Sequence, residues 1–296
     1  MSLSTTLLLG LIAGGTIVIG LPVGRLRRPA PRLRALLNAI AVGILLFLVW
    51  DVLSSAWRPV DSALVSVHAG HGGVGSAIGY GLLFATGLSV GLLSLLAYET
   101  WMAGKLRRPS GRDAPATGGP GTLSVRQDVS ARHGIAAWST ARQLSLLIAV
   151  GIGLHNFAEG LAIGQSAATG EVSLATMLVI GFALHNATEG FGIVAPLTGD
   201  LDEHGAARRP SWPFLLSMAA IGGGPTFVGT ALGHSFTSAA VSVVFLTLAA
   251  GSILYVVIQL LGVAAKNGYK TLLMYGLLIG LLAGFATDAI VSAAGG

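Results

Sequence analysis

The chain has 296 residues, of which 53% are hydrophobic and only 10% are charged, and it contains no cysteine. Because a soluble globular domain carries about 25% charged residues, this composition excludes that class and predicts an integral membrane protein. The lack of cysteine excludes disulfides, thiolate metal sites and thiol catalysis. The formal net charge of +5 does not indicate nucleic-acid binding, since the basic residues lie in loops between apolar segments.

Eight apolar segments of about 20 residues are each long enough to cross a bilayer. In chain order they lie near residues 5–24, 36–55, 78–102, 144–166, 174–196, 212–234, 240–262 and 272–294. We therefore expect an all-α membrane protein in which residues 1–296 form a single transmembrane domain. The polar stretch 103–143, rich in Pro and Gly, predicts a flexible cytoplasmic loop. This loop divides the helices into a 3+2+3 arrangement.

The basic residues predict how the chain is oriented. All of the 17 Lys and Arg residues except Arg58 fall in the loops after the first, third, fifth and seventh apolar segments. Since cytoplasmic loops are enriched in Lys and Arg, these four loops are predicted to face the cytoplasm. We therefore expect a multi-pass protein of the cell (inner) membrane with both termini outside the cytoplasm.

The fourth and fifth segments repeat one pattern, Leu-His-Asn-x-x-Glu-Gly-x-x-Ile. It places His155 and Glu159 in the fourth segment and His185 and Glu189 in the fifth. In a helix, residues four apart lie on the same face, about 6 Å apart along the axis. Ionisable residues inside a membrane span are costly and rare, so they indicate function.

On neighbouring antiparallel helices these four side chains would form a short ladder near the bilayer midplane. Their nitrogen and oxygen atoms suit a first-row divalent metal ion. Asn156 and Asn186, which follow the two histidines, can add carbonyl oxygen ligands or orient the imidazoles. The alternative is that each His–Glu pair is a hydrogen-bonded pair or a polar clamp between helices.

Several other features have roles that the sequence leaves open. Gly222-Gly223-Gly224-Pro225, in the sixth segment, predicts a kink beside the metal site or a kink that serves packing only. Five polar residues could guide cations or be incidental: Asp51, His68, His71, His204 and Asp288.

His155-Asn156-x-x-Glu159-Gly160 and His185-Asn186-x-x-Glu189-Gly190 resemble the helix 4 and helix 5 signatures of the ZIP (Zrt/Irt-like protein) metal transporters. The eight segments and the long loop after the third also match. The resemblance implies transport of a divalent transition-metal ion into the cytoplasm, most often zinc, and in some members iron, manganese or cadmium. It further implies an elevator-like movement of helices 1, 4, 5 and 6 against helices 2, 3, 7 and 8, and it makes a homodimer an expected assembly.

By this resemblance the metal ligands are the four motif residues, with Asn156 and Asn186 close by. Four positions depart from the family pattern, and two of them, Ala158 and Thr188, stand where many members have a proline before each motif glutamate. Gly224 stands where many members have a glutamate before the helix 6 proline, and Gln259 stands where many have a helix 7 glutamate. We therefore expect one main metal ion per transport site.

Two further functions fit the same residues. A zinc hydrolase embedded in the membrane would use three protein ligands and an activated water, although the chain lacks the His-Glu-x-x-His motif. A proton-coupled carrier of an organic solute would use the His–Glu pairs as a proton relay. We favour the metal transporter, which is not an enzyme and needs no cofactor, with the divalent ion and the lipid bilayer as its partners and no nucleic acid.

Overall fold

The computed structural model describes residues 1–25, 31–106, 138–194, 196–197, 208–266 and 268–293. In these residues eight helices are long and apolar enough to cross a membrane, which confirms the expected all-α membrane class. The elements are α1 (Leu3–Gly15), η1 (Thr16–Arg25), α2 (Pro31–His68), α3 (Val74–Leu106), α4 (Thr140–Ala168), α5 (Val172–Val194), α6 (Trp212–Gly233), α7 (Ala239–Lys266) and α8 (Lys270–Ala293). Here η1 is a 3-10 helix that continues α1.

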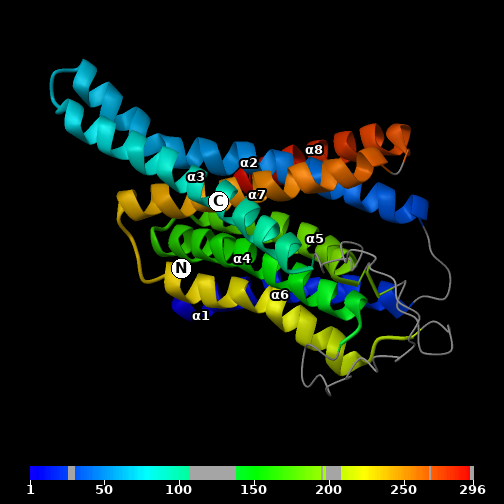
Figure 1. The fold of residues 1–296 in the computed structure, drawn as a ribbon. Helices are drawn as coiled ribbons and strands as arrows, with labels where there is room; N and C mark the ends of the chain where they lie inside the picture. The colour runs from blue at the N-terminus through cyan, green and yellow to red at the C-terminus, as the bar shows by residue number, and fades with distance from the viewer. Residues whose placement is uncertain (26–30, 107–137, 195, 198–207, 267, 294–296) are drawn as a thin grey trace, which may run out of the picture.

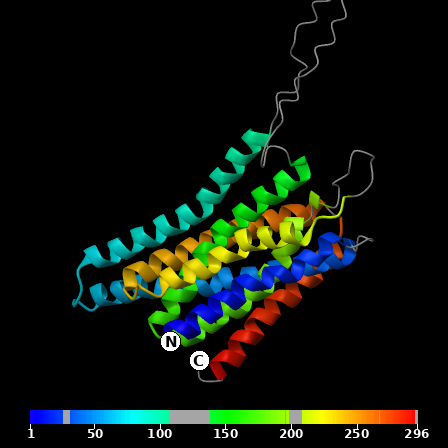
Figure 2. The same ribbon diagram turned by 90° about the horizontal axis from the view of Figure 1, so that it is seen from below.

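The helices lie roughly along one direction, and both chain ends lie at the same end of the bundle (Figures 1 and 2). We call this the hairpin end, because it holds the α2–α3, α4–α5 and α6–α7 turns. The opposite, basic end holds Arg25 at the end of η1, where its Nη1 donates to the carbonyl of Pro210 at 2.5 Å. This hydrogen bond ties η1 to the start of α6.

Several helix bounds differ from the sequence prediction. α2 has 38 residues and continues past the apolar stretch 36–55, and its end with the start of α3 projects beyond the other helices (Figure 1). Hydropathy marks the part of a helix that suits lipid, so it misses a helix that continues into water. Both ends of the predicted loop 103–143 are helical, because α3 extends to Leu106 and α4 begins at Thr140. The part of this loop from 107 to 137 lies outside the described residues.

Local signals explain where several helices begin and turn. Ser2, Ser139 and Ser211 each cap a helix, because the side-chain oxygen accepts from the backbone N–H three residues on. The α2–α3 and α4–α5 turns use Gly70 and Gly170 with φ of +72° and +86°, a left-handed backbone region that favours glycine.

The helices pack as two sets. The motif set consists of α1, η1, α4, α5 and α6, and the flanking set consists of α2, α3, α7 and α8. The tightest contacts within the sets are α4 with α6, α2 with α8, and α3 with α7. The sets meet mainly where α4 lies on α7 and where α5 lies on α2.

Glycines distinguish contacts within a set from contacts between sets. A Cβ at Gly160, Gly223 or Gly43 would collide with backbone atoms of a helix in the same set. A Cβ at Gly181 or Gly151, which face the other set, would meet only side-chain atoms. Backbones therefore touch inside each set, as glycine allows in lipid, while side chains separate the two sets.

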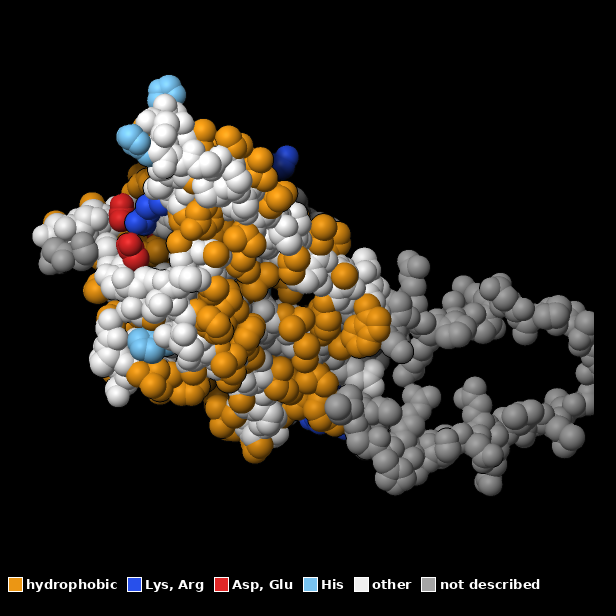
Figure 3. Space-filling model, turned by 90° about the vertical axis from the view of Figure 1, so that its left-hand side faces the viewer, with side chains coloured by type: hydrophobic (Ala, Val, Ile, Leu, Met, Phe, Trp, Pro, Cys, Tyr) orange, Lys and Arg blue, Asp and Glu red, His pale blue; other side chains and the backbone are white. Residues whose placement is uncertain are grey.

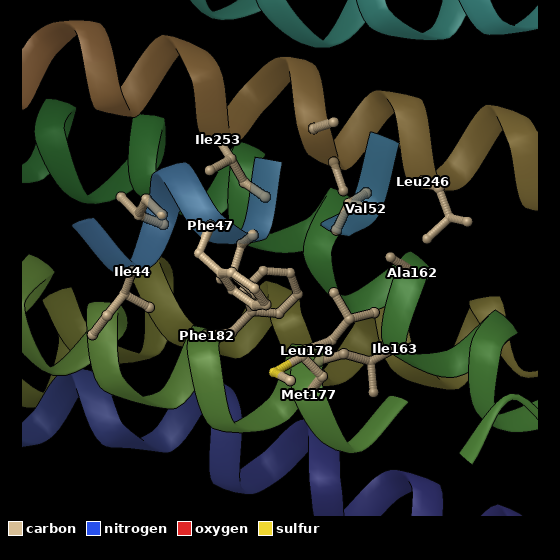
Figure 4. Packing of buried hydrophobic residues seen from close by; sticks show 14 of the residues in the cluster. Ile44, Phe47, Val52, Ala162, Ile163, Met177, Leu178, Phe182, Leu246 and Ile253 are labelled. Atoms are coloured by element: carbon tan, nitrogen blue, oxygen red, sulfur yellow. The ribbon is translucent and has the colours of Figure 1, made fainter. Parts of the chain in front are cut away.

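Apolar side chains fill the space between the sets toward the hairpin end (Figure 4). We call this group the apolar seal, and its members come from α2, α4, α5 and α7: Val52, Ala162, Ile163, Leu178, Phe182, Leu246 and Ile253. All are buried, with 2% or less of their surface exposed. The seal thus forms a continuous apolar contact between the two sets on this side.

Two adjacent glycines of α6 test the backbone contact with α1. We expect Gly223→Ala to lower the melting temperature by roughly 5 °C, because its Cβ would collide with the Gly14 carbonyl and overpacking costs about 1–3 kcal/mol. Gly224→Ala should leave the melting temperature unchanged or raise it, since no atom lies within 4 Å of its Cβ position. Thermal unfolding of the detergent-solubilised variants measures both, and equal shifts would contradict the packing described.

Candidate metal centre

The two repeated motifs face each other in the middle of the motif set. α4 and α5 run antiparallel through the turn at Gly170, so that His155 and Glu159 meet His185 and Glu189. The exposed fractions of these four side chains range from 0% for Glu159 to 8% for Glu189. The structure thus brings together all four residues of the predicted cluster inside the protein, away from lipid.

Each histidine contacts the glutamate of the other helix. Nε2 of His155 lies 2.7 Å from Oε1 of Glu189, and Nε2 of His185 lies 3.2 Å from Oε1 of Glu159. Within α5, Nε2 of His185 lies 3.8 Å from Oε1 of Glu189. The result is a ladder of two rungs, each of which joins α4 to α5.

The spacing of these atoms can be compared with a tetrahedral metal site. Bond lengths near 2.0–2.2 Å place two ligands of one zinc ion about 3.3–3.5 Å apart. The His185–Glu159 separation of 3.2 Å is close to this value, and the ligand atoms of His155, Glu159 and His185 lie within 4.8 Å of one another. The His155–Glu189 separation of 2.7 Å must widen before both atoms can hold the same ion.

Most of these close atoms have no hydrogen-bond partner. Nε2 of both histidines, both oxygens of Glu159 and Oε1 of Glu189 are buried, and apart from the close His–Glu contacts they have no polar partner among the described residues. Among the described side chains, no Lys or Arg lies within ion-pair distance of either carboxylate. Buried acceptors left unpaired are costly, so this group suits a divalent cation.

The two asparagines connect the motif helices to their neighbours. Nδ2 of Asn156 donates to the carbonyl of Gly222 on α6 at 2.9 Å, and Nδ2 of Asn186 donates to the carbonyl of Ala13 on α1 at 3.0 Å. Both side chains are fully buried, and their Oδ1 atoms have no hydrogen-bond partner. Each amide therefore joins two helices and keeps one oxygen available.

Backbone carbonyls near the cluster support it further. Nδ1 of His185 lies 3.2 Å from the carbonyl of Gly181, which can only accept a hydrogen bond, so a proton on Nδ1 satisfies this contact and Nε2 is the nitrogen that faces the glutamates. The stretch Gly222–Pro225 remains helical within α6, and the bond from Asn156 to Gly222 places it beside the cluster. The stretch therefore lies beside the site and also packs closely against α1, while the kink itself stays a prediction.

A cavity of about 780 Å³ connects the cluster with the basic end of the bundle. His155, His185 and Glu189 line its deep part, and the residues near its other end include Ala35 at the start of α2, Pro196 just after α5 and Tyr269 just before α8. On the opposite side the apolar seal separates the cluster from the hairpin end. Water and ions therefore reach the cluster from the basic end in this conformation.

The remaining polar residues lie away from the cluster. Asp51 on α2 and Asp288 on α8 are partly buried, and His68 and His71 are exposed where α2 ends, while His204 lies outside the described residues. Figure 3 shows the hairpin end, with acidic and basic side chains close together on its surface. One such pair joins the two sets, since Nη1 of Arg58 lies 3.3 Å from Oε2 of Glu171.

One polar group in the cavity was missed by sequence reasoning. Glu99 on α3 lines the cavity, and Tyr255 and Gln259 on α7 donate hydrogen bonds to it. The sequence did contain a signal for this group. Glu99 is a carboxylate within an apolar span, and Tyr255 and Gln259 are polar residues four apart in the seventh segment.

Comparison with known proteins bears on the same region. A family model described as ZIP zinc transporter matches residues 117–292, a range that contains both motifs and α4 to α7 in full. No curated protein sequence matches the chain.

Proposed function

Because the chain belongs to the ZIP zinc transporter family, and is therefore a multi-pass membrane transporter of divalent metal ions, we propose that it carries zinc into the cytoplasm by an elevator-like alternating-access mechanism. The observation that supports this most directly is the cross-paired His–Glu ladder, whose buried ligand atoms lie on two adjacent spans. Iron, manganese and cadmium are alternative substrates, since all-nitrogen-and-oxygen ligation excludes none of them.

The ligands that we assign are His155, Glu159, His185 and Glu189. Their two carboxylates balance the charge of a divalent ion, and neutral imidazole nitrogens complete the shell. Asn156 and Asn186 would add an oxygen or hold the motif helices in position. The metal is the cargo and the protein forms no product from it, so we propose neither an enzymatic activity nor a bound cofactor.

The direction of transport rests on the orientation of the bundle. We place the basic end in the cytoplasm, because the helix ends that flank the Lys- and Arg-rich sequence segments lie there, and both termini outside. With this orientation the cavity leads from the ligands to the cytoplasm, and the apolar seal lies between the ligands and the outside. The conformation is then the one that releases the ion inward.

The packing of the two sets supports an elevator-like movement. All the assigned ligands belong to the motif set, whose helices touch through their backbones and are joined by both asparagines. Contacts with the flanking set run through side chains, such as Leu48 against Gly181 and Tyr98 against Gly151. Side chains can change partners at low cost, so we propose that the motif set moves as one body. A homodimer stays a prediction from the family resemblance.

Zinc uptake into proteoliposomes tests the ligand assignment. We expect His155→Ala and Glu189→Ala each to lower the initial rate at least tenfold, because the ion loses one of four ligands. Leu154→Ala and Leu184→Ala are matched controls, since these neighbouring side chains are 50% exposed and face away from the cluster. Equal rates in wild type and both ligand variants would contradict the site. Competition by iron, manganese and cadmium measures the selectivity.

Acidification tests the imidazole ligands. An imidazole must be neutral to bind metal, and an unperturbed one titrates at about 6.5, so a drop from pH 7.5 to 5.5 lowers its neutral fraction about tenfold. Protons therefore compete with zinc, and we expect the apparent affinity for zinc to weaken about tenfold or more over this range. Zinc-binding isotherms and uptake rates at both pH values measure the effect. Uptake that stays constant down to pH 5 would count against histidine ligation.

The absence of cysteine allows a direct test of access. Thr188, which lines the cavity, and Ala162, a member of the apolar seal, can each be replaced by a single cysteine. We expect a membrane-impermeant maleimide to label Thr188→Cys from the cytoplasmic side only and to leave Ala162→Cys unlabelled. Labelling of Thr188→Cys from the outer side alone would reverse the proposed orientation.

A further inference from the structure

Two polar contacts join the motif set to the flanking set, one on either side of the metal cluster. Toward the basic end, Oη of Tyr98 on α3 donates to the carbonyl of Leu147 on α4 at 2.8 Å. At the hairpin end, Nη1 of Arg58 on α2 donates to Oε2 of Glu171, in the α4–α5 turn, at 3.3 Å. A hydrogen bond weakens steeply as its distance and angle change, so neither contact persists when the two sets slide past each other.

The Tyr98 contact fits α4 at one height only. The ring lies against Gly151, where a Cβ would be 3.2 Å from its Cε1 atom. Leu147 is four residues before Gly151 and lies on the same face of α4, one turn nearer the basic end. A shift of α4 by one turn toward the hairpin end would replace the glycine opposite the ring with the Leu147 side chain. The same shift would carry the Leu147 carbonyl away from the hydroxyl.

The Arg58 contact is held in position from the flanking side. Nη2 of Arg58 donates to Oγ of Ser55, one turn earlier on α2, at 2.9 Å. This bond orients the guanidinium toward Glu171. The two charged side chains are 57% and 50% exposed, so water weakens their attraction and the pair can open. Since Arg58 lies outside the four basic loops, the rule that places basic residues in cytoplasmic loops does not account for it.

We propose that the Tyr98 hydrogen bond and the Arg58–Glu171 ion pair together form a latch that holds the motif set in its inward-facing position. The latch rests on the elevator-like movement of the proposed function, and it identifies contacts that must break before the metal ligands can face the outside. Each contact is weak by itself, so the latch shifts the balance between the inward- and outward-facing positions without preventing transport.

Labelling of Ala162→Cys from the outside tests the hydrogen bond, because this residue of the apolar seal becomes accessible when the seal opens outward. The labelling rate with an impermeant maleimide is then proportional to the outward-facing fraction. In this background we expect Tyr98→Phe to raise the rate about two- to tenfold, since it removes one hydrogen bond and keeps the ring against Gly151. The matched control is Tyr275→Phe on α8, a side chain that is 63% exposed, which should leave the rate unchanged.

An exchange of charges tests the ion pair in the same background. Glu171→Arg brings two cations together, and we expect it to raise the labelling rate roughly threefold. Addition of Arg58→Glu to that variant restores opposite charges and should return the rate toward that of Ala162→Cys alone. Misfolding would not produce such a recovery.

An unchanged rate in Tyr98→Phe, or no recovery in the variant with exchanged charges, would overturn the latch. Neither result affects the zinc uptake test of His155 and Glu189. Loss of uptake in those ligand variants together with unchanged labelling would therefore retain the metal site and reject the latch alone.

Discussion

The cross-pairing of two imidazoles with two carboxylates between α4 and α5 is the contact on which the rest of the structure depends. An ionisable side chain at the centre of a bilayer costs several kcal/mol when it faces lipid. α4 and α5 can therefore cross the membrane only with these four groups turned toward each other and covered by neighbouring helices. α1 and α6 provide that cover, and Asn156 and Asn186 fasten α4 and α5 to them.

The same requirement explains where glycine is used. Close covering of a polar cluster needs backbones in direct contact, and Gly160 and Gly223 permit it between α4, α6 and α1. The flanking set has its own backbone contacts, such as that of Gly43 of α2 with the Leu277 carbonyl of α8, but it meets the motif set through side chains. The cluster is thus packed tightly within the motif set, and the motif set contacts the flanking set only through side chains. The first kind of contact serves to bind the ion, and the second kind would allow the motif set to move.

Much of this could be predicted from the sequence, because the strongest constraints are local. Apolar length predicted the eight spans, and four-residue spacing placed His155 and Glu159 on one face of α4. What escaped prediction depends on distant contacts: that His155 meets Glu189 rather than Glu159, and that Glu99 is held by side chains 156 and 160 positions away. The length of α2 also escaped, since hydropathy measures the fit to lipid and not the end of a helix.

The two motifs lie on helices that run in opposite directions, so His155 is related to Glu189 as His185 is related to Glu159. A half-turn about an axis between α4 and α5 approximately exchanges the two pairs, as in the inverted repeats of other carriers. An ion that arrives from either face of the membrane therefore meets much the same coordination. The coordination itself therefore favours neither face, and any preference for one direction of transport must come from the unequal surroundings above and below it.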